Sequence, residues 1–575
     1  MHTGYANSAV KSFFGCSGTG WQCVSQVTAA AVLMPKPEDA GYETAFDIPC
    51  LKAVDADSVK RRMQGPPPVF SLASATRLFA VLLGCLVASA TAAAVAAEKL
   101  NVLMIIADDL RPDLGCYGHQ QIRSPNIDRL ASSGMVFERA YCQVALCNPS
   151  RASFLTGMRP GTTQVLDNAR HIRDALPAAV TLPQFFKQQG YYTQGLGKIY
   201  HPGRDDRDSW SVPHWDPQSS SIDTHGEALV GEMKAYYGPE GRAIVQRRAD
   251  HHTKAGKDVD KLSRRDLMGP AWEVADAPDG ALIDGQTAER AIQVLRTMKD
   301  QPFFLAVGFL KPHLPFSAPK KYWDLYPPDQ IKLGVRRPPR DAPACALHQY
   351  SELRACLGIP ATGPINDDQA RPLIRGYRAA TSYMDAQLGR VLAELDRLSL
   401  RDRTIVVFFG DHGYQLGEHG LWCKHTNFEL ATRAPLIIRA PGRGARGQRT
   451  AALVEFVDIY PTLVQLAGLS PPAQLEGTSL VPLFERPTRP WKAAAFSEYL
   501  QPGKERITGN SIRTERWRYT EWTNAGNQRV GTELYDHQDD PAENENVAGD
   551  PKNSAIISDV AQRLQAGWKA ALPRH

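Results

Sequence analysis

Short apolar runs are the clearest local pattern along the chain. Leu100 to Ile106, Phe303 to Phe309 and Ile405 to Phe409 are each almost wholly apolar and five to seven residues long. Runs of this length predict strands buried on both faces, as in a parallel sheet that helices cover on both sides.

Helical stripes precede the second and third of these runs. The first stripe has apolar residues at i, i+3, i+4 and i+7, and Thr287 stands before it as a candidate N-cap. Its members are Ala288, Ala291, Ile292 and Leu295. The second, longer stripe consists of Tyr377, Ala380, Met384, Leu388, Val391 and Leu395. A helix followed by a buried strand, twice over, predicts βαβ units and an α/β fold with a large, mostly parallel sheet flanked by helices.

The regions outside this alternation predict other kinds of structure. Residues 204–275 are rich in Asp, Arg, His, Ser and Gly with little periodicity, which predicts irregular structure or a long insertion over the site. Later, a helical stretch from Asp458 to Leu466 precedes Ser511 to Trp522, which alternates like an antiparallel strand. We therefore expect a large domain at residues 98–445 and a smaller C-terminal α+β subdomain at residues 446–575.

The N-terminus contains the longest apolar stretch, Leu78 to Ala97, which follows Arg77 and ends in small residues. Its dense part, Leu78 to Val87, is too short to span a bilayer and is typical of an export signal. A retained membrane anchor and a lipoprotein cleavage box are the alternatives. Because signal sequences have short leads, we expect translation to start near Met63, residues 1–97 to be an N-terminal extension with the signal, and the mature protein to be periplasmic or secreted without stable membrane insertion.

Composition and charge narrow the function further. The 575 residues include 66 Lys and Arg against 61 Asp and Glu, so the formal net charge is +5. This excess is spread along the chain. Nucleic-acid-binding proteins concentrate Lys and Arg in basic runs, so the charge pattern argues against nucleic acid as a partner.

Six cysteines follow residue 97. Two of them, Cys345 and Cys356, lie in a Pro-rich segment, where they either form a disulfide in an oxidising compartment or stay free.

Polar residues follow two of the apolar runs directly. Asp108 and Asp109 come after the first, and Asp411 and His412 follow the third. Open α/β sheets bind their ligands at the carboxyl ends of the strands, so these residues are candidates for a common site. Each pair taken alone also fits a solvated turn or a helix cap.

The segment from Cys147 to Gly157 is the most specific motif in the chain, and it reads Cys-Asn-Pro-Ser-Arg-Ala-Ser-Phe-Leu-Thr-Gly. It resembles the signature C-x-P-S-R-x-x-x-L-T-G of type I sulfatases. In that family a formylglycine-generating enzyme oxidises the cysteine, and the hydrated aldehyde attacks sulfur to form a covalent sulfo-enzyme intermediate. The resemblance implies an alkaline-phosphatase-like sulfatase fold, conversion of Cys147 to formylglycine, and the generating enzyme as a partner during maturation.

The resemblance covers nearly all of residues 98–550 and is closest to iduronate 2-sulfatase-like sulfatases. The blocks that carry it are Asp108–Pro112, Leu114–Gly118, Ser124–Asp128, Gly197–Gly203, Lys311–His313, Asp411–Gly413, Leu416–Gly420 and Ser511–Thr514. It implies one divalent metal, held by Asp108, Asp109, Asp411, His412 and the group derived from Cys147. Ca²⁺ is the metal that the family and the three carboxylates favour, while the softer imidazole of His412 leaves Mn²⁺ or another ion open.

The remaining roles also come from the resemblance. Sulfate ester cleavage needs positive charge around the sulfuryl oxygens and an acid for the leaving alcohol. Lys198 and Lys424 match the residues that bind the sulfate oxygens, and Arg151 matches the one that holds the hydrate, one helical turn from the cysteine if a helix starts at Pro149–Ser150. His201 matches the residue that helps expel sulfate, and His313 the one at the leaving oxygen.

The segments that would face the substrate depart from the iduronate pattern. Tyr414 stands where the subfamily has Trp, and we expect its ring to stack on a sugar, while Arg159 would read hydroxyls or carboxylates. We therefore expect a sulfuric ester hydrolase that acts on a sulfated saccharide, such as a uronate in a glycosaminoglycan or algal polysaccharide. The alternatives are a phosphoesterase or phosphonate ester hydrolase of the same superfamily, and a non-catalytic carbohydrate-binding relative.

Overall fold

The computed structural model describes residues 99–218, 227–347, 351–444, 447–501, 503 and 505–573. The expected N-terminal extension, export signal and start near Met63 lie outside these residues. Seven strands form the main sheet in the order β11-β2-β10-β7-β1-β5-β3. At its centre, β1 (Asn101–Ala107) pairs in parallel with both β5 (Phe303–Phe309) and β7 (Thr404–Gly410), and all three are buried along their whole length, as predicted. The other four strands are β2 (Met135–Tyr141), β3 (Tyr192–Gly197), β10 (Leu436–Arg439) and β11 (Gln448–Glu455), of which β10 runs antiparallel to both its neighbours.

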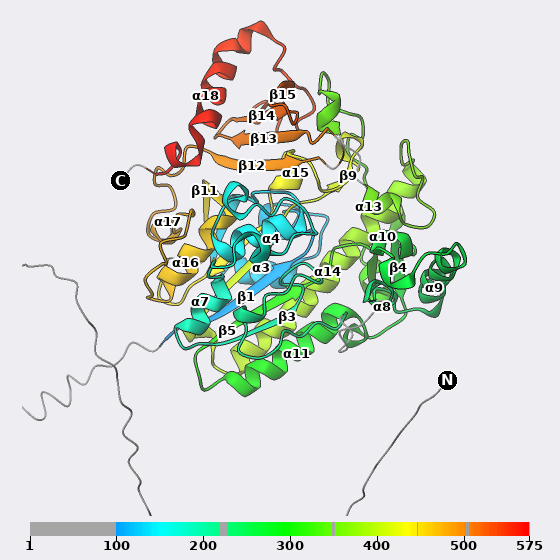
Figure 1. Ribbon diagram of the computed structural model, residues 1–575. Coiled ribbons are helices and arrows are strands. Elements are labelled where there is room, and N and C mark those ends of the chain that lie inside the picture. The colour runs from blue at the N-terminus through cyan, green and yellow to red at the C-terminus, as the bar shows by residue number, and fades with distance from the viewer. Residues whose placement is uncertain are drawn as a thin grey trace, which may run out of the picture. The chain divides into compact units, whose positions relative to one another are not determined.

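Helices cover both faces of this sheet (Figure 1). Alternate residues of β1 point to opposite sides, so Leu103 and Ile105 face one core while Val102 and Met104 face the other. The first core is covered by α3 (Pro125–Ala131), α11 (Ile283–Met298) and α14 (Asp367–Arg397), and the second by α4 (Cys147–Thr156), α7 (Leu182–Gln188) and α16 (Ile459–Leu466).

Two of the sequence expectations for helices need correction. Helix α11 begins at Ile283, so Thr287 is not its N-cap; the Thr287 hydroxyl instead donates to the Ile283 carbonyl oxygen at 3.0 Å within the helix. Residues 204–275 are not simply irregular, since they contain α8 (Glu227–Lys234), α9 (Pro239–Lys254), α10 (Arg264–Leu267) and β4 (Trp272–Ala275), which pairs with β6 (Phe316–Pro319). The helices bury only a small apolar cluster around Tyr236, so their sequences are mostly polar and lack a clear stripe.

The C-terminal part contains a second, antiparallel sheet. Its strands, in order, are β12 (Ala495–Leu500), β13 (Thr508–Arg513), β14 (Trp517–Thr523) and β15 (Arg529–Asp536), and α18 (Ser554–Ala570) packs on one face. The predicted single strand from Ser511 to Trp522 is wrong, because a turn at residues 514–516 divides it between β13 and β14. Strand β11 follows residue 446 yet pairs with β2 in the large sheet, so the expected boundary at 446 stays a prediction.

Shorter elements connect these layers. They are α5 (Pro160–Thr163), α6 (Ile172–Ala175), α12 (Lys320–Trp323), α13 (Ser351–Arg354), β8 (Gln415–Leu416), β9 (Trp422–Cys423), α15 (Glu429–Thr432) and α17 (Val481–Glu485). The candidate disulfide is absent, since Cys345 and Cys356 are free thiols that pack in separate apolar clusters.

Candidate active site

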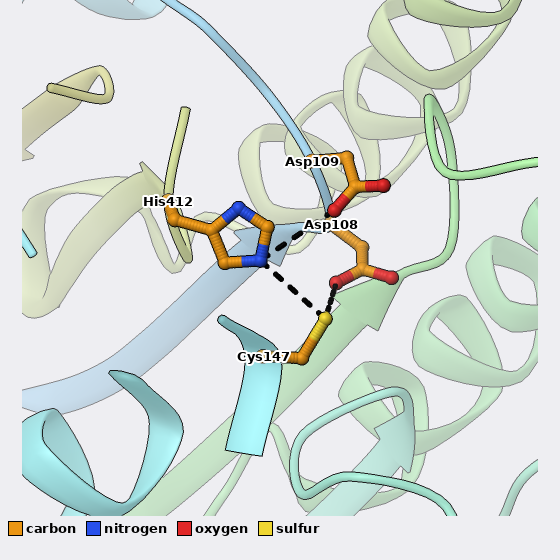
Figure 2. Close-up of side chains that lie close together, drawn as sticks. All are labelled: Asp108, Asp109, Cys147 and His412. Atoms are coloured by element: carbon orange, nitrogen blue, oxygen red, sulfur yellow. Dashed lines mark hydrogen bonds and ion pairs between the residues drawn. The ribbon is translucent and has the colours of Figure 1, made fainter. Parts of the chain in front are cut away.

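The ends of β1 and β7 and the beginning of α4 meet at Cys147 (Figure 2). The two strands are neighbours in register, with Ala107 opposite Gly410, so the residues that follow them lie side by side. The backbone N–H of Asp109 donates to Asp411 Oδ1 at 3.1 Å. The strand-end acids predicted from the sequence are thus brought together by the parallel pairing itself.

Cys147 is the first residue of α4 and is almost completely buried, at 1% exposure. The helix therefore begins two residues before the predicted Pro149–Ser150 step. The Cys147 sulfur lies 3.4 Å from His412 Nε2, 3.5 Å from Asp108 Oδ1 and 3.7 Å from Lys198 Nζ. Burial and the charge of Asp108 raise the pKa of the thiol well above its usual value, so the unmodified side chain is held as a protonated thiol and is a weak nucleophile.

The donor atoms around Cys147 fit a divalent cation. Asp108, Asp109, Cys147 and His412 each offer one ligand atom, and these atoms all lie within 4.8 Å of one another. The fifth predicted ligand, Asp411, adjoins the group, with Oδ2 3.6 Å from His412 Nε2. Burial and the neighbouring charge of Asp108 raise the pKa of Asp411, which means that the carboxylates repel one another. A cation between them would relieve this repulsion, and oxygen-rich sites of this kind suit Ca²⁺.

Three buried cations surround the acids. Arg151 places Nη2 3.0 Å from Asp108 Oδ1 and Nε 3.0 Å from Asp411 Oδ2. The Lys198 ammonium pairs with Asp108, and Lys424 Nζ lies 2.8 Å from Asp109 Oδ1.

The ion pairs keep these side chains ionised despite their burial. Burial alone would lower the pKa of each lysine, but Asp108 raises that of Lys198 and Asp109 raises that of Lys424. Likewise, burial alone would raise the pKa of Asp108, but the charges of Lys198, His313 and Arg151 lower it well below its usual value. The site therefore keeps three buried cations, Arg151, Lys198 and Lys424, beside the carboxylates.

His313 faces the acid group, and an unpredicted residue contacts it. Its Nε2 lies 3.9 Å from Oδ2 of both Asp108 and Asp109 and 2.9 Å from Oε1 of Glu352 in α13. The other oxygen of Glu352 pairs with Lys424 Nζ at 2.9 Å. Burial alone would raise the pKa of Glu352, but Lys424 and His313 lower it well below its usual value. Glu352 belongs to no motif and lies in a Pro-rich segment far from the sheet strands in sequence, so the sequence carried no signal for it.

His201 lies in the loop that follows Lys198 and is half-buried. Its Nδ1 has no hydrogen-bond partner among the described residues. Burial and the charge of Lys198 lower its pKa well below the usual value, so it is neutral near pH 7. No hydrogen bond or ion pair joins it to Cys147 within the described part of the chain.

The structure corrects both predicted substrate contacts. Tyr414 is fully buried, stacks on Tyr377 with ring centroids 5.5 Å apart, and donates its hydroxyl hydrogen to Cys423 Sγ at 3.3 Å. Arg159 donates to both carboxylate oxygens of Glu455, at 2.7 and 2.6 Å. Both side chains are occupied by internal contacts. Tyr414 lies in the loop after β7 and Arg159 in the loop between α4 and α5, and a loop side chain can turn into the core as readily as toward the site.

A thiol at a helix start, a cluster of buried acids and three fixed cations at the end of a mostly parallel sheet define a hydrolase of anionic esters. The family model described as "Sulfatase" matches residues 100–469, and one described as "N-sulphoglucosamine sulphohydrolase, C-terminal" matches residues 417–569. The chain therefore belongs to the sulfatase family and is a sulfuric ester hydrolase. Membership implies a metal ion and a formylglycine in the site.

Individual relatives agree with this assignment. Iduronate 2-sulfatase of Mus musculus is 36% identical over 86% of this chain and 98% of its own length, and that of Homo sapiens is 36% identical over 80% and 93%. The solved phosphonate monoester hydrolase of Silicibacter pomeroyi shares the fold, with a TM-score of 0.64 at 23% identity over 83% of this chain and 96% of that one. The predicted fold class and the resemblance to iduronate 2-sulfatase-like proteins are thus confirmed. In the described ranges, no helix has the length and hydrophobicity needed to cross a membrane.

Proposed function

We propose that the protein removes sulfate from a sulfated saccharide, with Cys147 converted to formylglycine by a generating enzyme. The observation that carries this proposal is the placement of Cys147 between the buried acids and the three cations, with its sulfur 3.7 Å from Lys198 Nζ. The saccharide class is supported by the relatives named iduronate 2-sulfatase and by the C-terminal match to an N-sulphoglucosamine sulphohydrolase.

The metal is proposed to be Ca²⁺, held by Asp108, Asp109, Asp411 and His412 together with the group at position 147. When bound, the metal offsets the negative charge of the sulfate group, and the formylglycine hydrate supplies the nucleophilic oxygen.

The chain's own residues provide the other parts of the reaction. Lys198 and Lys424 bind the sulfate oxygens, because both are buried cations that border Cys147 and the acids. Arg151 keeps Asp108 and Asp411 in place through its two 3.0 Å hydrogen bonds.

The two histidines take opposite proton roles in the proposal. His313 donates a proton to the leaving alcohol oxygen, and Glu352 orients its ring from 2.9 Å. His201, neutral near pH 7, accepts a proton as sulfate is expelled.

The test is mass spectrometry of the tryptic peptide that contains Cys147, after expression with and without a formylglycine-generating enzyme. We expect the active preparation to have exchanged one sulfur and two hydrogens for one oxygen at residue 147. Cys142 lies in the same peptide and should remain a thiol, which makes it an internal control. An unmodified thiol at residue 147 in protein that turns over would contradict the proposal. Rates on sulfated disaccharides, an aryl sulfate and an aryl phosphate then separate sulfatase from phosphoesterase activity.

We also propose that residues 1–97 contain an export signal, with translation starting near Met63, and that residues 446–575 form the C-terminal subdomain. N-terminal sequencing of the native protein tests the first part. A mature N-terminus just after residue 97 supports export, and a peptide from upstream of Met63 argues against that start.

A further inference from the structure

A cavity of about 710 Å³ lies beside helix α18 and the antiparallel sheet. Most of its lining comes from α5, strands β12 to β15 and α18, and Figure 1 shows α18 beside this sheet. None of the residues that we place in the active site contributes to its lining. The cavity is large enough for a small organic ligand.

The wall of this cavity contains a buried amide without partners. Gln143 is only 2% exposed, and neither its Nε2 nor its Oε1 has a hydrogen-bond partner among the described residues. Buried polar side chains are nearly always hydrogen-bonded, so we expect a bound molecule to form hydrogen bonds with this amide. Its backbone is fixed, because the Gln143 carbonyl accepts the N–H of Glu498 at 2.8 Å.

Two further planar polar groups stand next to Gln143. Glu498 also lines the cavity, and its carboxylate makes no hydrogen bond or ion pair with any described residue. Asn510 lies directly opposite Glu498 in the β12–β13 pairing and lines the cavity as well. Two amides and a carboxylate together offer both donors and acceptors, which is the combination that adjacent hydroxyl groups need.

Aromatic rings supply an apolar surface in the same cavity. Phe496 and Trp568 line it, and the Arg159 guanidinium carbon lies 5.9 and 4.9 Å from their ring centroids. Flat aromatic rings match the C–H faces of sugar rings, and polar side chains at their edges fix the hydroxyls.

The charged side chains that line the cavity indicate which kind of ligand it does not favour. The two arginines that line it are already paired, Arg159 with Glu455 and Arg529 with Glu521 at 2.9 Å. Burial raises the pKa of the Glu498 carboxyl to about 7, so near neutral pH this group both donates and accepts hydrogen bonds. With both arginines already paired, the lining offers no free cation to a sulfated or carboxylated sugar.

We propose that this cavity is a second saccharide-binding site, which takes an unsulfated, uncharged sugar unit through its hydroxyl groups. The choice of a saccharide rests on the proposed function, but binding here needs neither formylglycine nor turnover. A failure of this site and a failure of the proposed sulfatase function are therefore distinguishable.

The test is isothermal titration of the full-length protein with two uncharged probes, cellotriose and the N-acetylglucosamine trimer. We expect saturable binding of at least one probe, and excess inorganic sulfate should leave it unchanged. Gln143→Leu, Glu498→Ala and Trp568→Ala should each weaken binding by about tenfold or more, because each removes a group that contacts the sugar. Gln465→Leu changes an exposed glutamine of α16, outside the cavity, and should have no effect.

Thermal unfolding of each variant separates loss of the site from loss of the fold. If Gln143→Leu does not fold, Glu498→Ala and Asn510→Ala carry the same test at more accessible residues. The proposal is overturned if neither trimer binds saturably, if sulfate displaces the trimer, or if the folded variants bind as the unaltered protein does.

Discussion

Glu352 Oε1 lies 2.9 Å from His313 Nε2, the ring nitrogen that faces Asp108 and Asp109. The other ring nitrogen, Nδ1, lies 2.6 Å from the Leu314 carbonyl oxygen. With an acceptor within reach of each nitrogen, the imidazole has one orientation. Its Nε2 N–H points at Glu352, so a leaving oxygen that takes this proton has to displace the carboxylate from Nε2. Glu352 is thus a positioning residue for the proposed acid.

Glu352→Gln should lower kcat on a sugar sulfate by about tenfold or more, since general acid catalysis contributes roughly 10²–10⁴-fold and depends on geometry. An aryl sulfate with a good leaving group should lose much less, because its departure needs little protonation. Steady-state kinetics on both substrates measure the difference. As a matched control, Glu289→Gln alters a surface ion pair with Arg390 and should change neither rate. Equal losses on both substrates would mean that Glu352 has only a structural role.

Removal of divalent metal should abolish activity and lower the thermal unfolding temperature, because Asp108, Asp109 and Asp411 would be left to repel one another. Restoring Ca²⁺ at about 100 times its Kd should return about 2.7 kcal/mol of stability. Calorimetry and rates after chelation, followed by addition of Ca²⁺ or Mn²⁺, measure both effects.

A variant pair makes the metal test specific. Asp411→Asn should weaken this stabilisation, whereas Asp396→Asn, at an exposed carboxylate, should leave it unchanged. Recovery with Mn²⁺ but not Ca²⁺ would refute the choice of metal.

Tyr414→Phe should leave KM for a sulfated saccharide unchanged, because the Tyr414 ring stacks on Tyr377 inside the core. Tyr414→Ala should instead lower the free energy of unfolding by about 3–5 kcal/mol, as expected for the loss of a buried aromatic side chain. Urea unfolding and KM values measure the two effects. A folded, fully stable Tyr414→Ala protein with a much higher KM would show that the ring contacts substrate after all.

Glu429→Gln should destabilise the protein by about 3 kcal/mol at pH 7, because it breaks a buried ion-pair group. The Glu429 carboxylate lies 2.5 Å from Arg518 Nη2 and 3.2 Å from Arg513 Nε, which connects α15 to the antiparallel sheet. Burial alone would raise the pKa of Glu429, but the two arginines lower it well below its usual value.

The pH dependence of this effect has a definite sign. Because the folded pKa is below the unfolded value of about 4.3, the contribution is complete above that pH and is lost as the pH falls through the folded pKa. The difference from the unaltered protein should therefore be equal at pH 8 and pH 6 and shrink below about pH 4. Asp559→Asn, at an exposed pair with Arg563, is the control and should cost at most about 0.5 kcal/mol. A difference that grows toward low pH would contradict this account.

The parts of the site that follow regular structure could be predicted from the sequence. Asp108 and Asp411 were identifiable because they follow buried parallel strands, whose carboxyl ends share one edge of the sheet. Cys147 and Arg151 are four residues apart, so they share a helix face wherever α4 begins.

The parts that depend on tertiary packing could not be predicted. Glu352 reaches the site from α13, 72 residues before Lys424. No local sequence pattern indicates that the segment around α13 folds back onto the site. Tyr414 turns into the core because Tyr377 provides a ring to stack on, a contact between a loop and a distant helix. Helix α9 was missed because its polar sequence buries only a few apolar side chains in a small separate cluster.

The order in which the strands leave the ribosome bears on how Cys147 is modified. β1 is synthesised first, yet its partners β5 and β7 follow about 200 and 300 residues later, and β11 completes the sheet only at Glu455. At roughly 5–20 residues per second, synthesis from Cys147 to Glu455 takes about 15–60 s. Since Cys147 is only 1% exposed in the folded protein, we expect the proposed oxidation to precede closure of the sheet, which cannot happen before β11 has been synthesised. Faster closure of the sheet would therefore produce well-folded molecules that have permanently lost the chance to become active.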